Sequence, residues 1–224
     1  MVDPDALLPV LFIAGFAVLA IGLIAYSIIT TRKRTQEMEQ AANGLGMTFL
    51  GKSFDPKSHA IGRFDLFDRG RSRKAYNAME ARLGDVDVLI FDYRYTIGSG
   101  KNSTTYSQTV VALGCQQHRL PRFAVKPEHF GHRIASVFGF DDIDFKGDPE
   151  FSKRYHVSGE DRAAIIETFH SGVRRHLTQM ENAGCVEGDG DWLLWYRSGK
   201  RRRPDEIQDL MNEALDTSSH LSVR

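Results

Sequence analysis

The sequence has few cysteines and no excess of charge of either sign. Its 224 residues include only 2 cysteines, and 29 Lys and Arg side chains are balanced by 29 Asp and Glu. Two cysteines, Cys115 and Cys185, are too few for a disulfide scaffold and are most simply free thiols. Balanced charge argues against generic nucleic-acid binding, which needs a basic surplus, so we predict no specific nucleic-acid partner. The remaining composition, 42% hydrophobic and 26% charged, is that of a folded chain.

A long N-terminal stretch also lacks charged side chains, and residues 7–29 are almost wholly apolar. At about 1.5 Å per residue these residues as a helix reach about 35 Å, enough to cross a hydrocarbon core of about 30 Å. A cleaved secretory signal is the alternative, but its basic start is replaced here by Asp3 and Asp5, and its apolar run is usually only about 7–15 residues long. We therefore predict a retained transmembrane helix over residues 7–30, after a short extracytoplasmic tail over residues 1–6.

A basic cluster of Arg32, Lys33 and Arg34 follows the span directly. Lys and Arg are concentrated on the cytoplasmic side of membrane spans, which places the acidic tail outside and everything from Arg32 onward in the cytoplasm. No later stretch has half of the apolar length that a second span would need. We therefore expect a single-pass protein of the inner (plasma) membrane, with the lipid bilayer as a partner and the basic cluster at the membrane interface.

Beyond the span the sequence predicts a helical stalk over residues 31–46 and one cytoplasmic domain over residues 47–222. The stalk ends in Asn43-Gly44-Leu45-Gly46, which is typical of a helix C-terminus. The domain is long enough to bury a core of its own. Strand patterns dominate its first half and predict an antiparallel meander over residues 76–83, 86–96 and 105–113, with shorter strands at 122–126 and 154–157.

The middle strand of this meander carries apolar side chains on both faces. Positions 89, 91, 93 and 95 share one face, and positions 86, 88 and 90 share the other until Asp92 interrupts it. A strand with two apolar faces is central in its sheet and covered on both sides, by helices or by a second layer.

Helical patterns come later in the chain. We predict a helix over residues 127–138, a second one after a capping signature at residues 158–161 that continues to Met180, and a third that begins at Pro204. A hairpin of residues 185–187 and 192–196 precedes the last helix. Strands grouped before helices predict the α+β class: an N-terminal transmembrane helix followed by an antiparallel-sheet domain with segregated helices.

Two segments partly match ligand-binding motifs. The Gly98-Ser99-Gly100-Lys101 sequence is similar to part of a phosphate-binding loop, but the full motif needs Gly at position 95 and Ser or Thr at position 102, so a hairpin tip is favoured. Residues 142–147 are similar to the start of a calcium loop. Lys side chains stand at two of its ligand positions, which favours a solvated loop.

Metal and catalytic motifs are likewise incomplete. His129 and His132 could present two imidazoles to one zinc ion, and Cys115 lies close to His118, but neither pair has the further ligands that zinc requires. The sequence motifs of serine and metal hydrolases are missing, although a triad assembled only in space would leave no such motif. We therefore predict no metal, no cofactor and no catalytic residue, and keep a membrane-bound hydrolase or transferase as the alternative.

Basic side chains also gather in two runs within the domain, at residues 69–74 and at Arg197 with the four residues 200–203. Solvated loops and a helix start are the simplest interpretation. A tethered domain already lies near an anionic leaflet, so contact with lipid headgroups is the alternative, with about 1 kcal/mol expected for each basic group. The residues predicted for this contact are Lys200, Arg201, Arg202 and Arg203.

Four segments of the domain are distinctive: residues 91–101 (FDYRYTIGSGK), 107–113 (SQTVVAL), 120–128 (LPRFAVKPE) and 148–159 (DPEFSKRYHVSG). With these segments the sequence resembles an uncharacterised family of bacterial single-pass membrane proteins with no assigned activity. The resemblance implies an anchor followed by a cytoplasmic α+β domain and assigns no catalytic residue. Together with the missing motifs, it leads us to expect a protein-interaction or positioning module at the inner leaflet, with a protein partner whose identity the sequence does not give.

Overall fold

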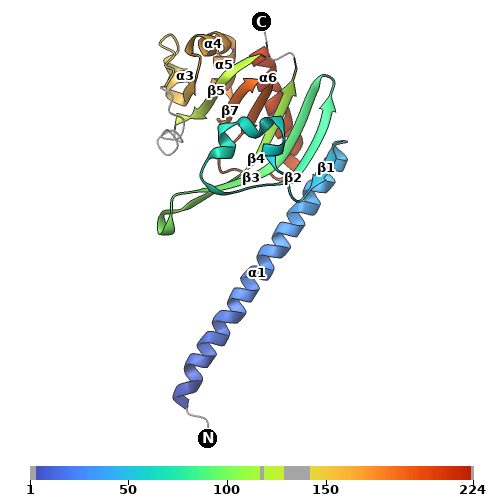
Figure 1. The fold of residues 1–224 in the computed structure, drawn as a ribbon, viewed down its shortest axis with the longest axis vertical. Coiled ribbons are helices and arrows are strands. Elements are labelled where there is room, and N and C mark those ends of the chain that lie inside the picture. Colours follow the sequence, from blue (N-terminus) through green and yellow to red (C-terminus); the bar gives the residue numbers. More distant parts are fainter. Residues whose placement is uncertain (1–3, 117–118, 129–141, 223–224) are drawn as a thin grey trace.

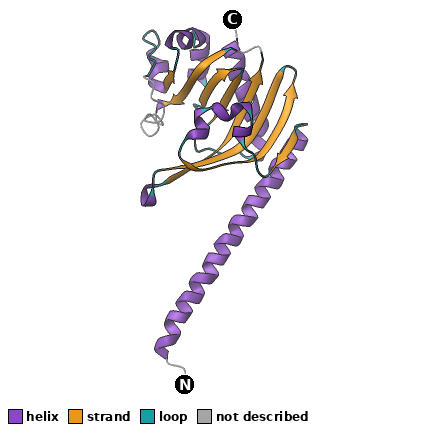
Figure 2. Ribbon diagram, viewed as in Figure 1, coloured by secondary structure: helices purple, strands orange, loops and turns teal. Residues whose placement is uncertain are grey.

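The computed structural model describes residues 4–116, 119–128 and 142–222. A long helix, α1 (Pro4–Gly44), carries an α+β domain at its C-terminal end (Figure 1). The domain contains one antiparallel sheet with helices, as the α+β prediction required (Figure 2). The predicted fold class is therefore confirmed.

The N-terminal part of α1 is long and apolar enough to cross a membrane. The candidate span begins at Ala14 among the residues whose side chains are described, has a mean hydropathy of 2.0, and buries none of its apolar window within the protein. Phe16, for example, is 74% exposed. Apolar side chains exposed over several helical turns require a lipid environment, so the protein is membrane-associated.

The helix ends where the sequence predicted an end. Gly46 adopts a left-handed φ of +68°, and the N–H groups of Gly46 and Met47 donate to the carbonyls of Asn43 and Ala42 at 3.2 and 2.8 Å. This pair of bonds satisfies carbonyls that the end of a helix leaves unpaired. It also turns the chain sharply into the first strand.

The eight strands of the described residues form one sheet in the order β1-β2-β3-β4-β8-β7-β5-β6, and every neighbouring pair is antiparallel. The predicted meander forms its second to fourth strands, with Asp92 of β3 directly opposite Thr109 of β4. The strands are β1 (Thr48–Gly51), β2 (Arg71–Leu83), β3 (Val86–Ile97), β4 (Thr104–Cys115), β5 (Leu120–Pro127), β6 (Tyr155–Gly159), β7 (Cys185–Gly190) and β8 (Trp192–Tyr196).

Each face of the sheet is covered, as the two apolar faces of β3 predicted. Val88 and Ile90 belong to a core that includes Met38 of α1 and the helices of the second half of the chain. Leu89 belongs to a second core, on the opposite face. The cover there consists of three short 3-10 turns, η1 (Pro56–Ser58), η2 (Ala60–Arg63) and η3 (Asp65–Asp68), which the sequence analysis did not predict.

The helix predicted to continue to Met180 is two helices, α4 (Arg162–Thr168) and α5 (Ser171–Gln179). Phe169 lies between them with a ψ of 52°, which is not helical. Its buried ring packs edge-on against the ring of Phe123, and the two ring centroids are 4.9 Å apart. The side chain of His170 then accepts a hydrogen bond from the N–H of Gly172 and starts α5. The break lets Phe169 enter the core, and periodicity alone does not reveal it.

Within the part of the chain that the structure describes, the other helices are α3 (Pro149–Arg154) and α6 (Ile207–Ser222), with the 3-10 turns η4 (Gly100–Asn102) and η6 (Pro204–Glu206). Pro204 begins η6, which leads directly into α6 as the sequence predicted. The helix predicted over residues 127–138 lies outside the described residues from residue 129 onward.

One member of the first basic run is not a surface residue. The side chain of Arg69 is fully buried and forms an ion pair with Glu187 of β7. Its Nη1 donates to Tyr196 Oη at 2.8 Å, and that hydroxyl donates to Glu187 Oε1 at 2.7 Å. Arg69 therefore ties the 3-10 cover to the sheet and is unavailable to lipid or nucleic acid.

Candidate functional site

The candidate site lies where α1 meets the sheet, and its centre is Asp92. Asp92 is on β3, on the same face as Val88 and Ile90, and its side chain is 0% exposed. A buried carboxylate is costly unless charge and hydrogen bonds compensate it. The surroundings of Asp92 therefore determine what this junction can do.

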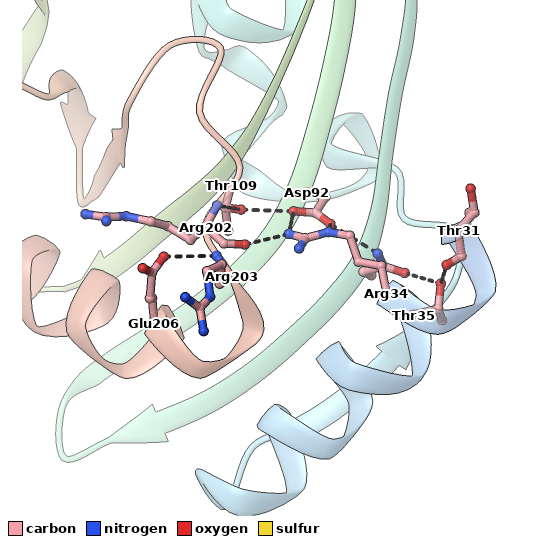
Figure 3. Close-up of polar contacts among 9 residues, drawn as sticks. Thr31, Arg34, Thr35, Asp92, Thr109, Arg202, Arg203 and Glu206 are labelled. Carbon is pink, nitrogen blue, oxygen red and sulfur yellow. Dashed lines mark hydrogen bonds and ion pairs between the residues drawn. The ribbon is translucent and has the colours of Figure 1, made fainter. Parts of the chain in front are cut away.

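Arg34 of α1 supplies the compensating charge. Its Nε donates to Asp92 Oδ2 and its Nη2 donates to Asp92 Oδ1, both at 2.8 Å (Figure 3). Two parallel bonds between a planar guanidinium and a carboxylate fix direction as well as distance. Only 16% of the Arg34 side chain is exposed. The end of the apolar helix is thus attached to the middle of the sheet.

Neighbouring strands complete the hydrogen bonds of the carboxylate. Thr109 Oγ1 on β4 donates to Asp92 Oδ1 at 2.9 Å, and Asn77 Nδ2 on β2 donates to Oδ2 at 3.1 Å. Asn77 adopts a φ of 54° within a register shift of β2, a bulge conformation that Asn tolerates well. Thr35 of α1 in turn donates to Asn77 Oδ1 at 2.8 Å, so α1 contributes a second contact.

A third part of the chain, the loop between β8 and η6, joins the same atoms. The carbonyl of Arg202 accepts a bond from Arg34 Nη2 at 2.9 Å, and its N–H donates to Thr109 Oγ1 at 3.0 Å (Figure 3). The basic cluster at residues 32–34 and the basic run at residues 200–203, far apart in sequence, therefore meet at one place. We call this set the Asp92 network: Thr35 and Arg34 of α1, Asn77, Asp92 and Thr109 of the sheet, and the backbone of Arg202.

The electrostatics of the network favour the charged pair. Burial acts to lower the pKa of Arg34, but its hydrogen bonds to Asp92 and the charge of that carboxylate outweigh burial, so the pKa is raised. Arg34 is therefore charged at every physiological pH. Removing one partner of a buried pair leaves the other uncompensated and typically costs about 3–5 kcal/mol.

The helix beyond the span is part of this packing. Met38 and Ala42 are fully buried one and two turns after Arg34, and α1 contacts β1, β2 and η6. Residues 31–44, where a stalk was predicted, are helical and continuous with the span, but one side of this segment lies against the sheet.

The predicted membrane-interface residues have unlike surroundings. Arg32 and Lys33 are exposed, with Lys33 Nζ 3.7 Å from Glu37 of the next turn. Arg34 faces the sheet instead, and because its guanidinium is bound to Asp92 it is not free to contact headgroups. The basic cluster therefore divides into two surface cations and one structural one.

The second basic run divides in the same way. Lys200 and Arg201 are exposed, whereas Arg202 Nη2 is bound to both carboxylate oxygens of Glu213 on α6 at 2.9 and 3.1 Å. The guanidinium of Arg203 is paired with Asp205. A groove of about 800 Å³ separates α1 from this run. It is lined by Arg34, Glu37, Gln40, Ala41, Arg201, Arg202, Arg203, Pro204 and Asp205.

The partial motifs of the sequence have structural explanations. Residues 98–101 form the tip of the hairpin between β3 and β4, as predicted. Asp142 lies 3.1 Å from Nδ1 of His156 and accepts a bond from the N–H of Val157, an arrangement that joins a loop to β6. His118, His129 and His132 lie outside the described residues.

The thiol of Cys185 is not activated as a nucleophile. Cys185 is buried, and burial raises its pKa to about 11, so its thiol is protonated at neutral pH.

A cavity of about 1060 Å³ lies between α3 and the β8–η6 loop. Its lining, as far as the chain is described, is made largely of Lys, Arg and Glu side chains, which suit polar ligands.

Sequence reasoning missed the partners of the basic residues. Asp92 was noted only as the point at which the apolar face of β3 is interrupted, and that interruption was the available signal. A carboxylate on an inward face of a central strand requires a cation nearby. Neither Asn77 nor Thr109 gave such a signal, because both are ordinary strand residues until the bulge and the strand register bring them to Asp92.

The fold and the junction together define a class: a membrane-associated protein whose antiparallel α+β domain packs directly onto the last turns of the helix that carries its apolar segment. No family model and no curated protein matches the sequence. Among solved structures, the crystal structure of the mycobacterial trehalose monomycolate transport factor A is similar, with a TM-score of 0.56, 12% sequence identity, and coverage of 85% of this chain and 93% of that chain. At this identity the likeness concerns the fold alone.

Proposed function

We propose that the protein is a single-pass, membrane-anchored module that holds its α+β domain in a fixed orientation at the cytoplasmic face of the inner membrane, where the domain binds or positions a protein partner. The Asp92 network carries this proposal. A domain that only needed to be kept near a membrane could hang from a flexible linker, whereas here the helix is bonded to two interior strands of the sheet, β2 and β3.

Two further observations support the proposal. Arg32, Lys33, Lys200 and Arg201 are exposed near the end of the apolar segment, where each could add about 1 kcal/mol of attraction to an anionic leaflet. The structural neighbour is named as a transport factor, and an accessory role in such a process suits a positioning module.

Topology is tested first with reporters fused after Arg224. We expect a reporter that is active only in the cytoplasm to work and one that is active only outside it to fail. The reverse result would overturn the cytoplasmic placement.

Partner binding is tested by photo-crosslinking in native membranes, with the crosslinker at exposed positions of the domain. We expect a discrete adduct with one protein. The yield of this adduct should fall when Arg34→Gln and Asp92→Asn together loosen the junction. A matched control is Arg82→Gln, which breaks an exposed pair with Asp87 far from the junction and should leave the adduct unchanged. If membranes yield no adduct and the purified chain hydrolyses ester or phosphate substrates, the module is an enzyme and the proposal is wrong.

A further inference from the structure

Three potential metal ligands from distant parts of the sequence meet where α5 packs on α6. His176 lies on α5, and Asp216 and His220 lie one turn apart on α6. One ligand atom from each residue lies within 4.8 Å of the other two. The shortest approaches of the carboxylate are 3.6 Å to His176 Nδ1 and 3.6 Å to His220 Nδ1, longer than a good hydrogen bond.

The surroundings of His176 determine which nitrogen is available. Its Nε2 lies 3.2 Å from Thr217 Oγ1, and the hydroxyl proton of Thr217 is already donated to the carbonyl of Glu213 at 2.8 Å. Thr217 can therefore only accept, so Nε2 carries the proton and the lone pair of Nδ1 faces Asp216. Histidine ligands of metals are commonly oriented by such a bond from the other ring nitrogen.

The cluster is buried on one side and open on the other. The side chain of His176 is 12% exposed, whereas that of Asp216 is 61% exposed and that of His220 is 38% exposed. An ion can therefore reach the three ligand atoms from the solvent side of α6.

From this geometry we propose that His176, Asp216 and His220 bind one divalent transition-metal ion of the Zn²⁺ class, which pins the C-terminal turns of α6 to α5. Two imidazoles and one carboxylate are a ligand set that suits Zn²⁺, and three protein ligands leave a coordination position open for water or for a group from another molecule. The site is independent of the proposed function.

Binding requires one defined movement. The two imidazole rings are stacked, with centroids 4.1 Å apart and planes 14° apart. A metal lies in the plane of each ring that binds it, so two stacked rings cannot both direct a lone pair at one ion. His220, which is 38% exposed and donates from Nδ1 to the carbonyl of Asp216 at 2.9 Å, is the ring that turns, because Thr217 holds His176 in place.

The test is a Zn²⁺ titration of the untagged full chain in detergent micelles. Binding is measured by calorimetry and by NMR of the histidine ring protons. We expect one Zn²⁺ per chain, no displacement by Mg²⁺, and shifts of the His176 and His220 resonances as their stack opens. His176→Ala should weaken binding at least about tenfold, as should Asp216→Asn, which changes an exposed side chain and leaves the fold intact.

Two further variants sharpen the result. Thr217→Val keeps the shape of the side chain but removes the bond that orients His176, so it should weaken Zn²⁺ binding less than loss of His176 itself. His59→Ala, at an exposed histidine outside the cluster, should leave binding unchanged. The proposal is overturned if wild-type protein takes up no Zn²⁺ saturably, or if the His176→Ala and Asp216→Asn variants bind it as tightly as wild type.

Discussion

Replacing Arg34 by Gln tests whether the junction of α1 with the sheet is as strong as its geometry implies. The change removes the charge that compensates Asp92 and both bonds of the bidentate pair. Loss of one partner of a buried pair costs about 3–5 kcal/mol. Asn77 and Thr109 continue to donate to Asp92, so we expect the lower end, about 3 kcal/mol.

The assay is thermal unfolding of the full chain in detergent, monitored by circular dichroism. For a domain of this size each kcal/mol lowers Tm by about 2–4 °C, so Arg34→Gln should lower Tm by about 6–12 °C. The control is Arg82→Gln, whose pair with Asp87 is exposed and is expected to contribute at most about 1 kcal/mol.

A second variant separates the buried charge from packing. With Arg34→Gln and Asp92→Asn combined, no uncompensated charge remains, so the double variant should be more stable than Arg34→Gln alone. If Arg34→Gln shifts Tm no more than Arg82→Gln does, or if the double variant loses the sum of the two single effects, the ion pair does not hold the helix to the sheet.

Three other predictions concern the interior of the domain. In native protein a maleimide should label half-exposed Cys115 and leave buried Cys185 unlabelled until unfolding, as mass spectrometry of digested protein would show. Burial, reinforced by the charge of Arg69, lowers the pKa of Lys126 to about 7. Between about pH 7 and pH 10 the unfolded state then holds a proton that the native state lacks, so the free energy of unfolding should rise with pH by at most about 1.4 kcal/mol per pH unit. This slope should be measurable in denaturant titrations of wild-type protein and should be lost in Lys126→Met. Gly188→Ala should lower the free energy of unfolding by about 1–3 kcal/mol in the same titration, because the new Cβ would lie 2.3 Å from the buried ring of Phe123; unchanged stability would show that the ring can move.

Periodicity and end signals predicted much of the fold because they depend on local properties of the chain. The apolar alternation of β3 correctly predicted a central strand covered on both faces, and Asn43 to Gly46 correctly predicted the end of α1. The order of the sheet could not be read in this way. The pairings of β4 with β8 and of β5 with β7 join strands that lie far apart in the sequence, and no local pattern specifies such pairings.

The sequence predicted the basic residues of the candidate site but not the residues that they bind. The sequence located the cations, Arg32 to Arg34 and residues 200–203, because runs of like charge are visible in a chain. It did not assign Arg34 to Asp92, since the two are joined by tertiary packing and not by spacing. The ligand set proposed on α5 and α6 is hidden from the sequence for the same reason: Asp216 and His220 lie a helical turn apart, but His176 comes from another helix.

The unbroken course of α1 has a consequence for how the domain faces within the plane of the membrane. A helix turns about 100° and advances about 1.5 Å with each residue. The number of residues between the span and Arg34 therefore sets the rotational orientation of the whole sheet about the axis of α1. One residue inserted after Thr31 would swing every surface of the domain by more than a quarter turn, with almost no change in its height above the bilayer. If the span rotated about its axis, the domain would rotate through the same angle.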